Sequence, residues 1–260
     1  MKEAIITEVR KQQPLIHHLT NQVVMNFSAN GLLSFGASPV MAKAEEEAAE
    51  MAAHADGLLI NIGTLTASDL KAMIFAGRTA NQKGIPVVLD PVGVAATSFR
   101  RNAVEQLLAE VQPTAIKGNA GEMAHLVGLP WETKGVDSIG GDAEHIAAQV
   151  ARTYETTAIV TGAKDIICTG NRNSENNTGH PLLAKITGAG CLLGSILTAC
   201  LTTSHPIQQQ ALAATEFYGT AAEYAAEISG TDRPGTFMPL FIDALHKHPA
   251  DFHIRRNTNE

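Results

Sequence analysis

Short apolar runs bounded by glycine or proline alternate along the chain with longer segments of helical periodicity. The run at 57–63 (GLLINIG) follows a helical segment at 45–55 (EEEAAEMAAHA), and the same pair of patterns recurs further on. Apolar runs of this length predict buried strands, and the segments between them predict helices. The alternation predicts an α/β fold, with a mostly parallel central sheet and helices on both faces.

The predicted elements follow one another in a regular order. Capping residues at 66–69 open a helix that Gly84 closes, and a second strand follows at 85–91. The other predicted elements are a helix at 101–111, a strand at 114–117, a helix at 141–154, strands at 157–161 and 165–169, and mostly helical chain from Thr187 onward. The polar stretch 170–179 (GNRNSENNTG) predicts a surface loop. No long linker divides the chain, which favours a single domain over 1–260.

Composition and charge exclude several classes of protein. Hydrophobic residues make up 45% and charged residues 17% of the 260 residues, so intrinsic disorder is excluded. The formal net charge of -7 makes a nucleic acid an unsuitable partner. The 3 cysteines form no CxxC pair, so neither a disulfide framework nor a zinc site is expected. No signal peptide or membrane-spanning run is visible, and we expect a cytoplasmic protein with no membrane partner.

The segment 187–194 (TGAGCLLG) carries the sharpest chemical signal. Its two glycines precede an apolar helical stretch, and a helix start offers free N–H groups at the positive end of the helix dipole. This combination favours an anion such as phosphate at Gly188, Ala189, Gly190 and Cys191. The segment matches neither GxxxxGK[ST] nor GxGxxG. From the glycines alone, a tight turn that allows close packing is an equally good interpretation.

Polar residues stand where the predicted strands end. Ligands of parallel sheets bind beyond the carboxyl ends of the strands, which directs attention to 61–64, Asp90, 117–122, 161–164 and 187–191. A carboxylate at Asp90 could hold Mg²⁺. Asn119 and Glu122 suit a helix start, with the acid near the positive end of the dipole. Each carboxylate alone is better interpreted as a cap, but their shared position at the expected crevice favours a joint role.

Segments from nearly the whole chain carry a family resemblance. They are PLIHHLTNQVVMNFSANGLLSFGASPVMA, LLINIGTL, VVLDPVG, IKGNAGEMAHLVG, IVTGAKD, KITGAGCLLGS and GTDRPGTF. In this order they resemble the hydroxyethylthiazole kinase family of the ribokinase-like superfamily. The combination of GASPVM, LDPVG, GNAGE and TGAGC is far more specific than any one of these motifs. The resemblance implies a single-domain, ribokinase-like α/β/α sandwich.

The resemblance also implies an activity. Members of this family transfer the γ-phosphoryl group of ATP to the alcohol of 4-methyl-5-(2-hydroxyethyl)thiazole, which salvages the thiazole half of thiamine. The implied cofactor is Mg²⁺, and the implied assembly is a homotrimer with each substrate site at a subunit interface. The wider superfamily usually reads GAGD, with the aspartate as base, where this chain reads GAGC, as thiazole kinases do.

Site residues follow from the same resemblance. Residues at the thiazole would be Asn21, Val23, Met41 and Gly188; residues at ATP would be Lys117, Asn119 and Thr161; and residues that govern Mg²⁺ would be Asp90 and Glu122. The family often has arginine at the position of Lys117. Cys191 would be the catalytic residue that orients or deprotonates the alcohol.

The sequence leaves alternatives open for the pKa of Cys191 and for the substrate. A free cysteine thiol, with a pKa of about 8.5, is mostly protonated at neutral pH. A helix N-terminus is expected to lower the pKa of Cys191, and nearby ATP phosphates are expected to raise it. The rival functions are a pyrimidine or pyridine alcohol kinase of the same superfamily, a Rossmann-like oxidoreductase, and a non-catalytic thiazole-binding protein. The GAGC turn weighs against the first, the failed GxGxxG against the second, and the joint presence of Asp90, Glu122 and TGAGC against the third.

Overall fold

Eight strands form one sheet in the computed structural model, which describes residues 2–130, 139–230 and 232–252. They are β1 (Leu15–Leu19), β2 (Ser38–Val40), β3 (Gly57–Asn61), β4 (Val87–Asp90), β5 (Ala115–Asn119), β6 (Thr157–Thr161), β7 (Asp165–Thr169) and β8 (Arg172–Asn176). Their order is β2-β1-β3-β4-β5-β6-β7-β8. Pairing is parallel from β2 through β6 and antiparallel from β6 to β8. The prediction of a mostly parallel central sheet is therefore confirmed.

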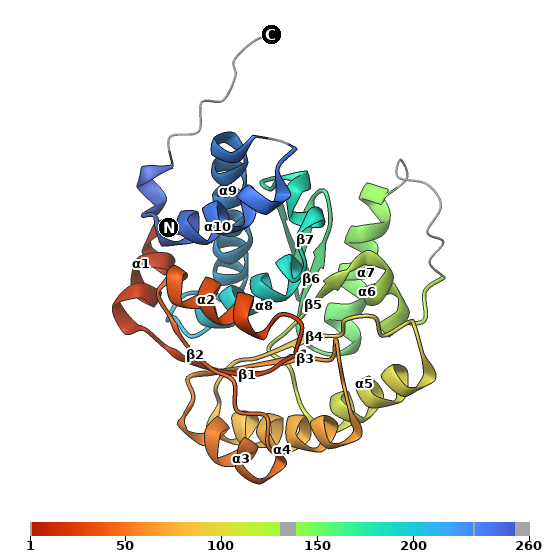
Figure 1. Ribbon diagram of the computed structural model, residues 1–260. Coiled ribbons are helices and arrows are strands. Elements are labelled where there is room, and N and C mark those ends of the chain that lie inside the picture. The colour runs from red at the N-terminus through yellow and green to blue at the C-terminus, as the bar shows by residue number, and fades with distance from the viewer. Residues whose placement is uncertain (1, 131–138, 231, 253–260) are drawn as a thin grey trace.

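Helices cover both faces of this sheet (Figure 1). They are α1 (Lys2–Gln12), α2 (Met25–Phe35), α3 (Glu45–His54), α4 (Ala67–Lys83), α5 (Ser98–Glu110), α6 (Ala120–Leu126), α7 (Ile139–Thr153), α8 (Ala189–Cys200), α9 (Ile207–Ser229) and α10 (Pro234–His246), with the short 3₁₀ helices η2 (Pro181–Lys185) and η3 (Pro249–Asp251). Helices α3 to α7 pack on one face, and α1, α2 and α8 to α10 pack on the other. This arrangement is the α/β/α sandwich that the sequence predicted.

Strand β3 shows why the strands read as continuous apolar runs. Successive side chains of a strand point to opposite faces. Leu58 and Ile60 join the core under α3 to α7, whereas Leu59 joins the core under α8 and α9. Because helices cover both faces, every position of the strand is buried, and no polar alternation remains.

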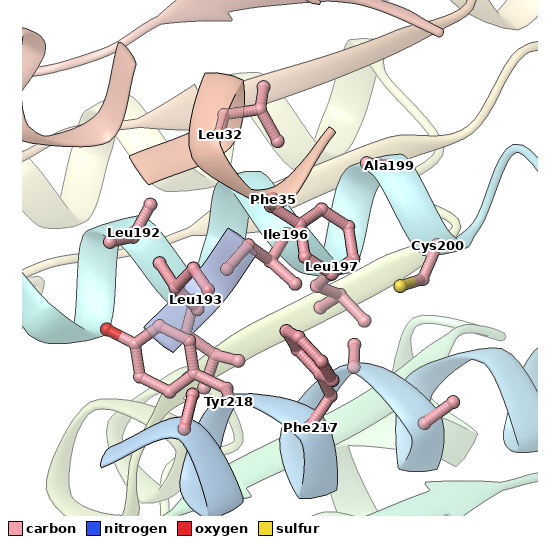
Figure 2. Packing of buried hydrophobic residues seen from close by; sticks show 14 of the residues in the cluster. Leu32, Phe35, Leu192, Leu193, Ile196, Leu197, Ala199, Cys200, Phe217 and Tyr218 are labelled. Atoms are coloured by element: carbon pink, nitrogen blue, oxygen red, sulfur yellow. The ribbon is translucent and has the colours of Figure 1, made fainter. Parts of the chain in front are cut away.

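Helix α8 lies in the middle of the core on the face of the sheet that α1, α2, α9 and α10 also cover (Figure 2). Its leucine and isoleucine side chains pack between α2 and α9, where Phe35 and Phe217 meet edge to face with ring centroids 5.3 Å apart. At the start of the helix, the buried Tyr218 hydroxyl donates to the Ala189 carbonyl. The N-terminal turn of α8 is therefore held firmly against α9.

The stretch 170–179 differs from the loop that the sequence predicted. Residues 172–176 form β8, which pairs antiparallel with β7 at the edge of the sheet. An edge strand is held by backbone hydrogen bonds and needs no apolar face, so its polar sequence gave no strand signal. Only Asn176 is buried in it, and its amide donates to the Asp165 carboxylate at 2.9 Å.

Some expectations reach beyond the described residues. The predicted domain over 1–260 includes 1, 131–138, 231 and 253–260, which lie outside them, and its boundaries stay a prediction. Within the described ranges, none of the helices combines the length and the apolar character that a membrane span requires.

Candidate active site

The strand order reverses between β1 and β3, because the chain passes from β1 to β2 on one side and then to β3 on the other. Open parallel sheets bind ligands beyond the carboxyl ends of their strands at such a switch point. Asn21 follows β1 here, Asn61 ends β3, Asp90 ends β4 and Thr161 ends β6. The sheet thus brings these predicted segments to one edge.

Lys117 and Asp90 form a buried ion pair at this edge. Lys117 Nζ lies 3.3 Å from Asp90 Oδ2 and donates to the Gly190 carbonyl at 3.0 Å. Burial raises the pKa of Asp90, Lys117 lowers it and Glu122 raises it, which leaves it at about 6. Burial lowers the pKa of Lys117, but the charges of Asp90, Cys191 and Glu122 outweigh burial and raise it overall. The ammonium group therefore stays charged beside the first turn of α8.

Gly188 lets α8 begin beside this ion pair. Gly188 is the N-cap of α8 and has a left-handed backbone with φ of 88°. A Cβ at this position would lie 2.6 Å from Val24 Cγ1, so only glycine fits. Gly188 supplies no side-chain cap, and the first N–H groups of a helix have no intrahelical partner. The positive end of α8 is therefore available to an anion.

The Cys191 thiol lies against two asparagine amides. Its Sγ accepts from Asn61 Nδ2 at 3.2 Å and from Asn21 Nδ2 at 3.5 Å. Burial raises the pKa of Cys191, and the Asp90 carboxylate raises it further; Lys117 and the two amides offset only part of this rise. Burial and the neighbouring carboxylate therefore outweigh the lowering effect that the sequence suggests for the helix N-terminus. The thiol is mainly protonated at neutral pH.

Glu122 joins α6 to the loop after β4. Asn119 Oδ1 accepts from the Glu122 backbone N–H, and Glu122 Oε2 accepts from the Asn119 backbone N–H, both at 2.9 Å. This capping box starts α6. The other carboxylate oxygen, Oε1, accepts from the Gly93 backbone N–H at 2.8 Å. Glu122 therefore lies next to the loop that follows Asp90, whether its role is structural or functional.

Asp90 and Glu122 are the carboxylates that could hold Mg²⁺. Within the described residues, no group of three or more histidine, cysteine, aspartate or glutamate side chains could hold a metal ion. Asp90 Oδ2 and both Glu122 oxygens already accept hydrogen bonds. Mg²⁺ commonly keeps several waters and uses one or two carboxylates together with phosphate oxygens. The donor set fits an ion held mainly by phosphate and water.

A cavity of about 570 Å³ opens at the same end of the sheet, between β6, η2, α8 and α9. It is lined by Thr161, Gly162, Ala163, Asp165, Thr178, Gly179, His180, Pro181, Leu183, Ala184, Ala189, Gly190, Leu193, Thr215, Tyr218 and Gly219. Two regions picked out from the sequence, the end of β6 and the start of α8, thus share one cavity.

Two residues predicted to contact the thiazole are open to solvent in the single chain. Met41 follows β2 and is half-buried. Val23 is 68% exposed, so one chain alone leaves it outside any closed pocket.

Two further residues at this edge have no role predicted from the sequence. Asn61 belongs to the segment 61–64, which the sequence indicates only as a whole. Arg100 gave no signal, because its partners are the backbone carbonyls of two separate loops. Its guanidinium donates to Ile62 O at 2.9 Å, Gly63 O at 2.6 Å and Val92 O at 2.6 Å. Arg100 therefore ties the loop after β3 to the loop after β4.

The chain is similar to known proteins of one family. The model of the hydroxyethylthiazole kinase family matches residues 6–251. Hydroxyethylthiazole kinase 1 of Oceanobacillus iheyensis is 57% identical over 252 residues, which cover 96% of this chain and 98% of that protein. A solved structure of a hydroxyethylthiazole kinase protein from Pyrococcus horikoshii is 38% identical, with a TM-score of 0.86 over 94% of this chain and 92% of that one.

A more distant structure bears on the fold alone. A ribokinase-like superfamily protein from Enterococcus faecalis superimposes with a TM-score of 0.68 at 14% identity, over 95% of this chain and 94% of that one. The fold is therefore ribokinase-like, and the chain belongs to the hydroxyethylthiazole kinase family.

Proposed function

We propose that this chain transfers the γ-phosphoryl group of ATP to the hydroxyl of 4-methyl-5-(2-hydroxyethyl)thiazole, a step of thiamine salvage. The observation that carries the proposal is the uncapped start of α8, which contains Cys191 and lies beside both the Lys117–Asp90 pair and the cavity. Phosphoryl transfer depends mainly on alignment and charge neutralisation, and this arrangement supplies both. The names of the relatives support the choice of substrate.

ATP would lie in the cavity with its phosphates toward α8. Thr161 lines the cavity at the end of β6, and Asn119 stands at the end of the neighbouring strand. The N–H groups at Gly188–Cys191 would receive the γ-phosphate, and the Lys117 ammonium would neutralise part of its charge. Mg²⁺, when bound near Asp90 and Glu122, supplies further charge neutralisation at the phosphate oxygens.

The thiazole alcohol would approach from the side of Asn21, Gly188, Met41 and Val23. Both N–H groups of Asn21 are already bonded, and its Oδ1 accepts no hydrogen bond from the described residues. That oxygen is therefore available to the substrate hydroxyl. Cys191 would orient the hydroxyl. The minor fraction with a deprotonated thiol, whose proton has gone to solvent, would take the proton of the hydroxyl late in the transfer, once the forming P–O bond has made it acidic. The phosphoryl–ADP bond breaks as the new bond forms.

The homotrimer, the cytoplasmic location and the single domain over 1–260 belong to this proposal. The exposure of Val23 supports the homotrimer, since a second subunit would be needed to cover it. Size-exclusion chromatography with light scattering tests the assembly, and a monomeric mass for active protein would contradict it.

An ADP-release assay tests the function. The purified chain is assayed with ATP and Mg²⁺, with the thiazole alcohol and a pyrimidine alcohol side by side. We expect ADP release with the thiazole and a product that carries one phosphate. Preference for the pyrimidine alcohol would assign the chain to another substrate, and no release with either would support a binding protein.

Exchange of Cys191 tests its role as proton acceptor. Cys191→Ala should lower kcat by about 10²-fold, the lower end of what general-base catalysis contributes. Cys191→Asp should keep or exceed wild-type kcat, because both asparagine amides and Lys117 lie where they can stabilise the new carboxylate. The measurement is kcat at saturating ATP and thiazole. An active alanine variant together with an inactive aspartate variant would mean that Cys191 only packs the helix start.

Exchange of Glu122 tests its part in Mg²⁺-dependent turnover. Glu122→Gln puts an NH₂ group against one of two backbone N–H donors, so we expect a loss of about 1 kcal/mol of unfolding free energy, typical of a broken cap. At every concentration in a Mg²⁺ titration, turnover should fall by more than this loss of stability can explain. Asp69→Asn makes the same amide change in the capping box of α4, where its NH₂ group must face either Lys43 or the Thr66 backbone N–H, and it should lose similar stability but keep turnover. Wild-type turnover in Glu122→Gln would refute the metal assignment.

A further inference from the structure

Asn61, at the carboxyl end of β3, uses every hydrogen-bonding group of its side chain. Its Nδ2 donates to Asp90 Oδ2 at 2.9 Å and to Cys191 Sγ at 3.2 Å. Its Oδ1 accepts from the Gly63 backbone N–H at 3.0 Å and from Asn21 Nδ2 at 2.9 Å. A primary amide has two donor hydrogens and two acceptor lone pairs. The side chain is therefore fully bonded, although it is only 1% exposed.

The Gly63 backbone N–H fixes the orientation of this amide, because it can only donate. Asn61 Oδ1 must face Gly63, and Nδ2 must then face Asp90 and Cys191. A flipped amide would oppose two N–H groups at Gly63 and two oxygens at Asp90. The amide thus joins the carboxylate and the thiol in one defined geometry.

Close packing at Gly63 supports the same arrangement. A Cβ there would lie 2.7 Å from Asn21 Nδ2 and 2.9 Å from its Cγ, so only glycine allows Asn21 to approach. Asn21 then directs its second hydrogen to Cys191 Sγ at 3.5 Å. Arg100 holds the same loop through the Gly63 carbonyl at 2.6 Å. The hydrogen bonds that join Asn21, Asn61, Asp90 and Cys191, here called the Asn61 network, are therefore held in place by backbone groups as well as by side chains.

We infer that Asn61 is a positioning residue for phosphoryl transfer, which holds the Cys191 thiol and the Asp90 carboxylate in fixed positions relative to each other. This inference rests on the proposed function. Asn61 acts through Cys191 and Asp90, and its neutral amide can donate to both where a carboxylate would repel Asp90.

Asn61→Asp is the sharpest test, because it is nearly isosteric and replaces the Nδ2 donor by an oxygen. We expect kcat to fall by about 10²-fold, while KM for the thiazole changes by less than about threefold, since the lost interaction positions the reacting groups. Asn102→Asp makes the same change at an exposed position of α5 and should keep wild-type kinetics. Wild-type kcat in Asn61→Asp would overturn the inference.

Alkylation of Cys191 by iodoacetamide gives a readout that needs no substrate, nucleotide or metal. Cys168 and Cys200 are buried, and mass spectrometry of the Cys191 peptide follows the reaction. The added negative charge in Asn61→Asp disfavours the reactive thiolate, so alkylation should slow by about tenfold. This result is expected whichever alcohol is the substrate. An unchanged rate would overturn the inference even if the wild-type chain phosphorylates the thiazole.

Two further variants keep the test decisive if Asn61→Asp folds poorly. Gly63→Ala adds no charge but displaces Asn21, and it should lower kcat by about tenfold in a protein with near-native melting behaviour. In a Cys191→Ala background, Asn61→Asp should lower kcat by a clearly smaller factor than it does in the wild type, because part of its effect acts through the thiol. Wild-type kcat in Gly63→Ala, or equal losses in both backgrounds, would overturn the inference.

Discussion

Gly190→Val is expected to lower turnover by at least about 10³-fold while the protein stays folded. A loss of this size is at the upper end of what removal of one oxyanion donor causes. Gly190 is the second residue of α8 and does not have a left-handed backbone. A Cβ there would meet only Lys117 Nζ, at 3.5 Å. Valine therefore fits the helix, but its branched side chain would occupy the space that we assign to the γ-phosphate.

Gly235→Val is the matched control. Gly235 is the second residue of α10, and a Cβ there would meet nothing within 4 Å. It places the same side chain in the first turn of a helix outside the proposed site, and it should leave kcat unchanged. Both variants are measured for kcat at saturating substrates and for melting temperature. Normal turnover in Gly190→Val would remove the start of α8 from the active site.

Lys117→Met is expected to reduce both stability and turnover. Lys117 is 3% exposed and pairs with Asp90, which is 1% exposed. Removal of one partner of a buried ion pair typically costs about 3–5 kcal/mol, because it leaves the other charge without compensation. Turnover should fall as well, since the ammonium also fixes the Gly190 carbonyl at the start of α8.

The stability loss in Lys117→Met should depend on pH. In the wild type the pKa of Lys117 is raised, so its contribution is fully present below its unfolded pKa and is lost only as the pH rises through the folded one. In the variant, Asp90 loses the cation that lowers its pKa, which is already about 6. A carboxyl group with a raised folded pKa destabilises the folded state as the pH rises from its unfolded value through its folded one. The loss should therefore be small near about pH 5 and large near about pH 8.

Urea denaturation at both pH values measures this difference. Lys164→Met is the control, because Lys164 pairs with Glu175 at the surface, where such pairs contribute about 0–1 kcal/mol. A loss in Lys117→Met that stays the same at both pH values would show that Asp90 is not the group left unpaired.

Local patterns account for most of what could be predicted about the fold. Strand β3 is apolar throughout and sits between helices with their own periodicity, so the sequence predicted it and its layer correctly. The capping sequences of α4 and α6 predicted helix starts that the structure confirms with reciprocal capping boxes. Strand β8 could not be predicted, because its only support is backbone pairing with β7 at the sheet edge.

The candidate site divides in the same way. The sequence alone predicted that Asp90, the segment 117–122 and the glycine turn at 187–191 lie together, because the carboxyl ends of parallel strands share one edge. It could not reveal that Asn61 donates to both Asp90 and Cys191, since these partners lie 29 and 130 residues away in the chain.

What the sequence by itself determined is the alternation of strands and helices, the positions of the caps and the glycine turn, since each depends on neighbours within a few residues. Only the tertiary structure decided the direction in which the pKa of Cys191 is shifted and the geometry of the hydrogen bonds around Asn61. A pKa depends on burial and on charges that approach through space, and at Cys191 burial and the Asp90 carboxylate outweigh the helix N-terminus that the local sequence shows. The pKa of the thiol is therefore raised, first because the thiol is buried and further because β4 ends near it with Asp90, and neither fact is contained in a local pattern.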